Sequence, residues 1–123
     1  MNKIDPKITA LQFNQCINDH DINGIRNLMT ENHIFIDRHG DEYGDMVNGW
    51  IEFFTNYPTY KNVFTRVESS GNLVILIGYA IWSKDALEKD YAIWTATIED
   101  DLVSKWQIYE DTEENRKMLK IQA

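Results

Sequence analysis

Apolar residues recur at helical spacing in two segments near the start of the chain. The first segment opens at Asp5-Pro6, where a carboxylate can cap a helix and proline can fill its first turn. Its apolar stripe consists of Ala10, Phe13 and Ile17, with Leu11 alongside. The polar stretch NDHDING then breaks the helix, and Asp21 is placed to cap a second, shorter one. The stripe of that helix consists of Ile22, Ile25, Leu28 and Met29.

A third amphipathic segment covers residues 45–57. Met46, Trp50, Phe53 and Tyr57 share one side of it, with Val47, Ile51 and Phe54 next to them. Gly49 inside the segment costs about 1 kcal/mol relative to alanine, and Pro58 ends the helix. The sequence therefore predicts three helices in the first half of the chain.

Alternating apolar and polar residues predict β-strands over most of the remainder. The predicted strands cover residues 33–39, 60–68, 73–82, 91–98 and 103–110. Residues 40–44 predict a polar loop and residues 83–90 a charged connection, and Asp111 or Thr112 is expected to cap a short polar helix over 113–120. Helices that come early, followed by consecutive strands, predict an α+β fold with an antiparallel sheet.

Length and composition indicate a globular protein. The 123 residues suit one domain, residues 1–123, and 43% of them are hydrophobic. The opening MNKIDPK leads into a helix and lacks the apolar core of a signal peptide, so a cytoplasmic location is expected. The single cysteine, Cys16, lies among apolar neighbours and predicts an inert core thiol.

The charge of the chain narrows its expected partners. A net charge of −8 repels nucleic acid and anionic membranes, and neither is expected as a partner. Four Trp, six Tyr and five Phe exceed what a small core usually needs, so some are expected to line a cavity or a subunit interface.

Two stretches carry a resemblance to a known superfamily. LQFNQCINDHDINGIRNLMTENHIFIDRHG, residues 11–40, and KWQIYED near the C-terminus resemble the NTF2-like superfamily, and within it the SnoaL-like proteins and the steroid Δ-isomerases. The resemblance implies a cone-shaped fold, in which a curved antiparallel or mixed sheet wraps around the N-terminal helices, and a homodimer formed through the sheet. It is specific for the fold and not for an activity, because this superfamily holds isomerases, dehydratases, epoxide hydrolases, cyclases and non-enzymatic binders.

The resemblance places Asp37 on the carboxylate that moves a proton next to a carbonyl in the isomerases. Two hydrogen-bond donors of those enzymes are missing, since the tyrosine falls on Phe13 and the protonated aspartic acid falls near Trp94. Steroid isomerisation by that mechanism is therefore not expected. Asp37 is still expected to face the cavity, where desolvation among aromatic walls would raise its pKa toward that of a general base. The alternative is that Asp37 pairs with Arg38, Arg66 or Lys61, or caps the Gly40 turn.

Two further side chains are candidates for acid–base chemistry. His39 shares the strand parity of Asp37, and Glu110 would enter the cone from the last strand if it follows Trp106 and Ile108. The alternatives are that His39 is a solvent-exposed loop residue and that Glu110 is a solvated strand end. Arg38 is expected to point outward, because successive side chains of a strand point to opposite faces. His20 and His33 are expected to be surface or cap residues, and the scattered histidines have no metal-ligand spacing, so no metal is predicted.

Six aromatic residues are candidates for ligand binding. They are Phe13, Trp50, Phe54, Tyr79, Trp94 and Trp106. Parity places Ala92, Trp94 and Ala96 on one face of their strand and Tyr91, Ile93 and Thr95 on the other. The alternative for most of these rings is core packing, and a one-residue slip would reverse the face of Tyr79.

The sequence thus predicts a protein that binds a small, mostly apolar or aromatic, oxygen-bearing molecule in a cone pocket. If it is an enzyme, the expected chemistry is cofactor-free proton transfer, as in an isomerase, dehydratase or cyclase, with Asp37 as general base. The helper would be His39 or Glu110, and the donor to the substrate oxygen would be Tyr79 or Trp94. The alternatives are a non-catalytic ligand carrier and a protein-interaction module.

Overall fold

The computed structural model describes residues 4–83 and 88–122 of the chain. Its helices are α1 (Pro6–Asn18), α2 (Ile22–Asn27), α3 (Met46–Asn56) and α4 (Glu113–Met118). Residues 84–87, within the predicted charged connection, lie outside the described residues. No helix in the described ranges is long and apolar enough to cross a membrane.

The predicted capping residues begin three of these helices. Asp5 accepts a 3.0 Å hydrogen bond from the backbone N–H of Lys7, and Asp21 accepts one of 3.0 Å from Gly24. Of the two candidates for α4, Thr112 is the cap, while Asp111 forms an ion pair with Arg116 at 2.6 Å.

The described strands form one six-stranded sheet. They are β1 (Met29–Ile36), β2 (Glu42–Tyr43), β3 (Lys61–Ser70), β4 (Leu73–Ile81), β5 (Asp90–Glu99) and β6 (Leu102–Glu110). The order across the sheet is β2-β1-β6-β5-β4-β3, with β1 parallel to β6 and the other pairs antiparallel. The sheet is therefore mixed.

The first strand differs from its prediction at both ends. It begins at Met29 rather than residue 33, and it ends at Ile36, so that Asp37 opens a turn. The predicted loop over residues 40–44 holds the short strand β2, which pairs Tyr43 with Phe35. Two residues are too few for an alternation pattern to show.

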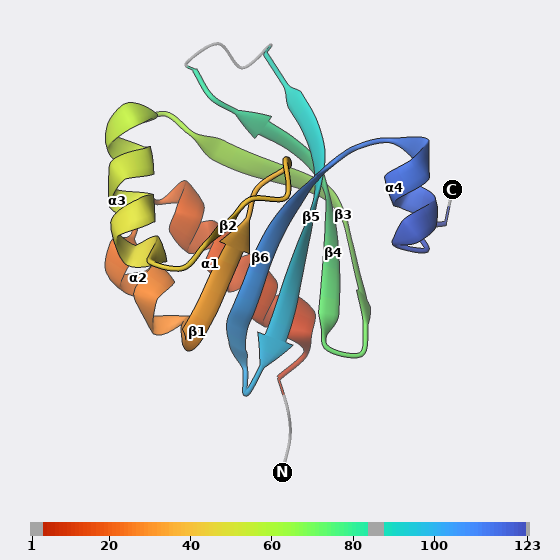
Figure 1. The fold of residues 1–123 in the computed structure, drawn as a ribbon, viewed down its shortest axis with the longest axis horizontal. Helices are drawn as coiled ribbons and strands as arrows, with labels where there is room; N and C mark the ends of the chain where they lie inside the picture. Colours follow the sequence, from red (N-terminus) through yellow and green to blue (C-terminus); the bar gives the residue numbers. More distant parts are fainter. Residues whose placement is uncertain (1–3, 84–87, 123) are drawn as a thin grey trace.

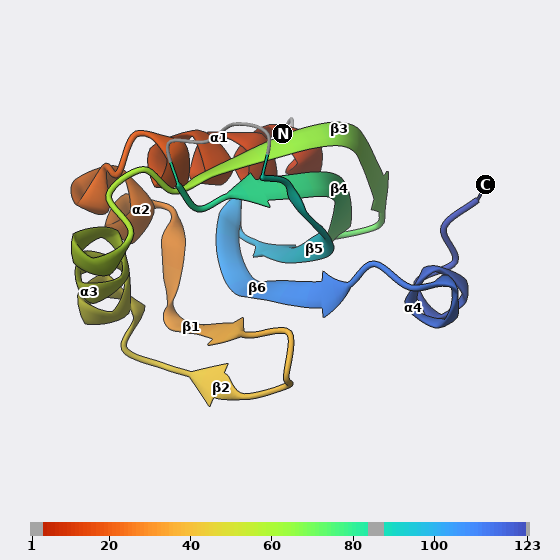
Figure 2. The same ribbon diagram turned by 90° about the horizontal axis from the view of Figure 1, so that it is seen from above.

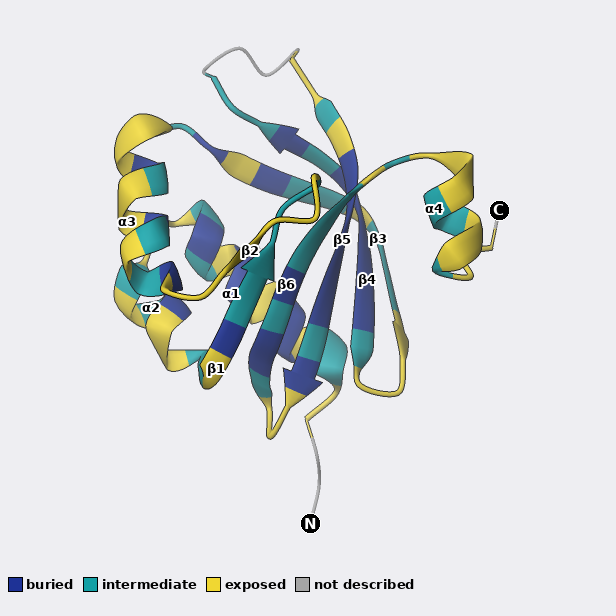
Figure 3. Cartoon of the chain, in the orientation of Figure 1, coloured by how far each residue is buried: buried dark blue, intermediate teal, exposed yellow. Residues whose placement is uncertain are grey.

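The sheet curves around α1, which packs across strands β3 to β6, as Figures 1 and 2 show. The inner face carries the larger apolar cluster, including Val74, Leu76 and Trp94, beneath the helices. The central strands β4 and β5 are buried along most of their length in Figure 3, because both faces of the sheet are covered there. The predicted parity of β5 is confirmed, because Ala92, Trp94 and Ala96 belong to this inner cluster.

The outer face of the sheet carries a smaller apolar cluster. Ile75, Ile77 and Ile93 form it, and Leu119 and Ile121 from the C-terminal segment pack against it. The chain thus covers part of its own outer sheet face.

A close backbone approach accompanies the bend of β3 and β4. The register between these strands shifts between Phe64 and Arg66. A Cβ atom on Gly78, in the facing strand, would overlap the carbonyl oxygen of Val63 and lie 2.9 Å from Cα of Phe64. Glycine at residue 78 therefore allows the two backbones to approach at the bend.

Candidate ligand cavity

A cavity of about 670 Å³ lies between α3 and the sheet. Helix α3 contributes six residues to its wall, and the rest come from β1, the following turn, β2, β6 and the neighbouring ends of β3, β4 and β5. The lining residues are Phe35, Asp37, Arg38, His39, Tyr43, Met46, Gly49, Trp50, Glu52, Phe53, Asn56, Tyr60, Trp82, Asp90, Trp106 and Ile108. Its volume falls in the range of small-molecule sites, which is roughly 300–1,000 Å³.

Aromatic rings packed edge to face build one side of the wall. The ring of Phe53 lies 4.7 Å from that of Tyr60 and 5.6 Å from that of Trp82, centroid to centroid. Trp50 contacts Phe35 at 6.0 Å from the other side. Rings fixed by one another present a preformed apolar surface, which lowers the entropy cost of ligand binding.

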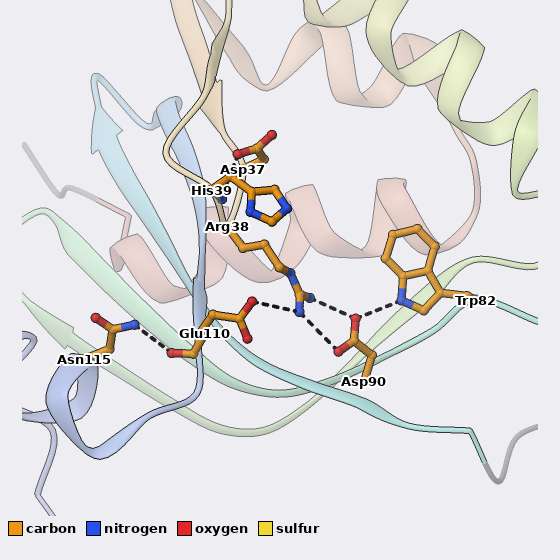
Figure 4. Close-up of polar contacts among 7 residues, drawn as sticks. All are labelled: Asp37, Arg38, His39, Trp82, Asp90, Glu110 and Asn115. Atoms are coloured by element: carbon orange, nitrogen blue, oxygen red, sulfur yellow. Dashed lines mark hydrogen bonds and ion pairs between the residues drawn. The ribbon is translucent and has the colours of Figure 1, made fainter.

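Arg38 is the centre of the polar side of the cavity, shown in Figure 4. Its two terminal nitrogens donate hydrogen bonds of 2.9 and 3.3 Å to the carboxylate of Asp90. The indole N–H of Trp82 donates a third to Asp90, over 3.0 Å. The prediction that Arg38 points outward is wrong, because the strand ends one residue earlier and strand alternation no longer governs its direction.

Glu110 completes this polar array from the end of β6. Its Oε1 lies 3.5 Å from a terminal nitrogen of Arg38, and its side chain is 53% exposed. Its backbone carbonyl accepts a hydrogen bond of 2.9 Å from the side-chain amide of Asn115 (Figure 4). Glu110 thus contacts the cavity through Arg38 and does not line it.

Asp37 lies on the cavity wall but caps the turn that follows β1. Its Oδ1 accepts hydrogen bonds from the backbone N–H groups of His39 and Asp41, at 2.9 and 3.0 Å, and its Oδ2 accepts one of 2.9 Å from the Tyr43 hydroxyl. Desolvation raises its pKa and is the largest single effect, but these three hydrogen bonds together outweigh it and hold the pKa below the usual value. The expected raised pKa is therefore wrong, and the turn-capping alternative describes the contacts.

The three histidines have different environments. His39 is exposed and lies on the cavity wall, and its role there stays a prediction. His20 is tied to the fold, because its Nε2 donates a 3.0 Å hydrogen bond to the Tyr60 carbonyl and its ring stacks on Phe54 at 4.1 Å.

His33 is buried, which corrects the expectation of a surface or cap residue. Its Nδ1 donates a 2.7 Å hydrogen bond to the Val103 carbonyl, and its Nε2 has no partner among the described residues. Burial lowers the pKa of His33, and the hydrogen bond to Val103 opposes this only in part.

The six predicted ligand-binding rings are divided between cavity and core. Trp50 and Trp106 line the cavity. Phe13, Phe54 and Trp94 are buried in the inner core and do not line it. Tyr79 lies on the outer face, 5.6 Å from the ring of Tyr91 and under the Lys89 ammonium at 4.8 Å. Neither Tyr79 nor Trp94 is therefore placed to donate a hydrogen bond into this cavity.

Sequence reasoning missed several wall residues, above all Arg38, Asp90 and Trp82. The signal for Arg38 was present in the run of three ionisable residues after the first strand. Asp90 belongs to a charged segment, and only the tertiary fold brings it within 2.9 Å of Arg38, 52 positions away.

The described residues include no group of three or more His, Cys, Asp or Glu side chains that could hold a metal ion. Cys16 packs against the inner core as a free thiol, and burial together with Asp21 and Asp19 raises its pKa. A raised pKa keeps the thiol protonated and unreactive at neutral pH.

Comparison by sequence finds no match, either with a family model or with a curated protein. Comparison by structure finds a cystatin fold protein from Novosphingobium aromaticivorans with a TM-score of 0.77, at 16% identity over 88% of this chain and 100% of that one. A protein from Shewanella putrefaciens, provisionally assigned as a SnoaL-like polyketide cyclase, has a TM-score of 0.74. Its identity is 14% over 98% of this chain and 89% of that one. An NTF2-like protein of unknown function from Cytophaga hutchinsonii has a TM-score of 0.72 at 16% identity over 97% of both chains. The chain has the cone-shaped NTF2-like fold, with a SnoaL-like protein among its structural neighbours.

Proposed function

We propose that the chain binds a small, mostly apolar, oxygen-bearing molecule in the cavity between α3 and the sheet. The observation that carries this proposal is the composition of the cavity wall. Seven aromatic residues supply apolar surface: Phe35, Tyr43, Trp50, Phe53, Tyr60, Trp82 and Trp106. Hydrogen-bonding groups gather where the turn after β1 meets the start of β5, which suits a ligand with a polar group at one end.

The first experiment is native mass spectrometry of the purified protein. A co-purified molecule of a few hundred daltons supports the proposal and identifies the ligand. The protein can then be unfolded, separated from this ligand and refolded. Adding the ligand back should quench the fluorescence of the cavity tryptophans.

A cavity-filling variant tests the location of the ligand. Ile108 lines the cavity, and Ile108→Trp should reduce binding about tenfold or more because the larger ring occupies the space. Gln107→Trp is the matched control, since the neighbouring side chain in β6 points to the opposite face. Equal binding by both variants would place the ligand elsewhere.

A second candidate function is cofactor-free proton transfer, as in an isomerase, dehydratase or cyclase. It is favoured by the position of Asp37 and His39 on one cavity wall. The low pKa of Asp37 keeps it ionised but makes it a weak base, so binding is the better supported function. Asp37→Asn separates the two once the ligand is known, because loss of turnover with retained affinity supports catalysis, and unchanged turnover excludes Asp37 as the base.

A further inference from the structure

Arg38, the only Lys or Arg among the described residues of the cavity wall, already has two anionic partners. Asp90 binds both terminal nitrogens of Arg38, and Glu110 lies 3.5 Å from one of them. The bidentate geometry is the strong form of this ion pair, and Trp82 fixes the same carboxylate with a third hydrogen bond. A ligand carboxylate would therefore meet a guanidinium whose positive charge is already balanced by two carboxylates.

The remaining charges on the wall also oppose an anion. Asp37, Glu52 and Asp90 line the cavity against the single guanidinium of Arg38. The ring faces of the wall carry partial negative charge, which attracts cations and tolerates neutral groups. The whole chain, with a net charge of −8, adds to the same field.

We propose that this cavity selects uncharged and cationic aromatic molecules and excludes carboxylates, and that Asp90 and Glu110 are the residues that set this selectivity. The inference rests on the proposed function and names the class of ligand that the same cavity takes. Asp90 neutralises Arg38 from inside the cavity, and Glu110 does so from its rim.

A matched series of probes tests the selectivity. The probes are 2-naphthalenemethanol, 2-naphthylmethylamine and 2-naphthoate, which share one ring system and differ in charge. Isothermal titration calorimetry at pH 7 should give naphthoate a dissociation constant at least about tenfold weaker than those of the alcohol and the amine.

Two variants assign the selectivity to residues. Glu110→Gln and Asp90→Asn should each strengthen naphthoate binding about fivefold and weaken amine binding by a similar factor, with the alcohol changed less than about twofold. Glu99→Gln is the control for Glu110→Gln, because this exposed residue lies at the opposite end of β5 and its substitution changes the net charge equally. Glu110 is half exposed, so its variant should fold even if Asp90→Asn does not.

The outcomes separate this inference from the proposed function. If none of the probes binds and no ligand co-purifies, the proposed function is wrong. Naphthoate binding as tightly as the alcohol would overturn the selectivity alone. The selectivity would also be overturned if Glu110→Gln changed the dissociation constants of naphthoate and the amine no more than Glu99→Gln does.

Discussion

The hydroxyl of Tyr43 donates a 2.9 Å hydrogen bond to Oδ2 of Asp37, across the short ladder between β1 and β2. This contact favours the ionised form of the carboxylate and contributes to its low pKa. The variant Tyr43→Phe should therefore raise the pKa of Asp37 toward its ordinary value. Titration of the Asp37 carboxyl carbon by NMR measures this, and Tyr57→Phe serves as a control because Tyr57 packs on Trp82 instead. An unchanged pKa in Tyr43→Phe would contradict the assignment.

The buried His33 predicts a loss of stability in mild acid. Its folded pKa lies below the usual 6.5, so the unfolded chain binds the proton more readily. Above about pH 6.5 His33 is neutral in both states, and the free energy of unfolding has its full value. As the pH falls below that value, the unfolded chain binds the proton first and the free energy of unfolding decreases. Urea unfolding at pH 7.5 and 5.5 should show a smaller pH-dependent change in His33→Gln than in the wild type. His39→Gln, at an exposed site, should keep the wild-type change, and equal pH dependence in all three proteins would contradict the prediction.

The backbone approach at Gly78 predicts a large effect of a single methyl group. Gly78→Ala should lower the free energy of unfolding by about 2 kcal/mol or more, because the added Cβ meets backbone atoms of β3 that cannot rotate away. Gly44→Ala is the control, since a Cβ there has nothing within 4 Å. Equal midpoints of urea unfolding for the two variants would show that β3 moves aside freely.

The homodimer expected from the resemblance remains a prediction, and the structure restricts where it can form. Leu119 and Ile121 cover the middle of the outer sheet face. The end of that face with Tyr79 and the exposed Tyr91 is therefore the surface on which we expect the second copy to pack. Native mass spectrometry should give a dimer for the wild type and mostly monomer for Tyr91→Asp, because a carboxylate buried at an apolar interface is costly. Ile51→Asp places the same charge on the exposed face of α3 and should remain dimeric. A monomeric wild type would refute the dimer itself.

The elements that the sequence predicted well are those controlled by local rules. Asp5 and Asp21 begin helices because a short carboxylate reaches the free N–H groups of the first turn, whatever lies around it. The two faces of β5 follow from alternation alone, whereas the inward direction of Trp94 was inferred from the family resemblance. Such features depend on a few neighbouring residues, so the sequence contains all the necessary information.

The candidate site was harder because one residue changes the direction of the chain. The strand before Asp37 ends at Ile36, and Gly40 adopts a φ of 86°, which closes a turn around the Asp37 carboxylate. The prediction that Arg38 points outward assumed that side chains keep alternating beyond Ile36, which holds only if the strand continues. The contact between Arg38 and Asp90 also depends on how β5 lies relative to the turn, which no local pattern reports.

Two other errors have the same long-range origin. His33 precedes an apolar run and has a polar side chain, but the parallel pairing of β1 with β6 buries it against Val103. The face of Tyr79 depends on register, and its neighbours Ile75 and Ile77 belong to the outer cluster.

The bend at Gly78 and the chemical character of the cavity wall depend on different residues. The approach of β3 to β4 depends on a missing side chain in the backbone scaffold, while the chemical character of the cavity depends on side chains such as Trp106 and Ile108 on other strands. We therefore expect that partly exposed wall residues such as Ile108 can be exchanged without altering the approach of β3 to β4. This makes the chain a suitable starting point for engineered receptors, in which a new ligand preference is introduced on an unchanged framework.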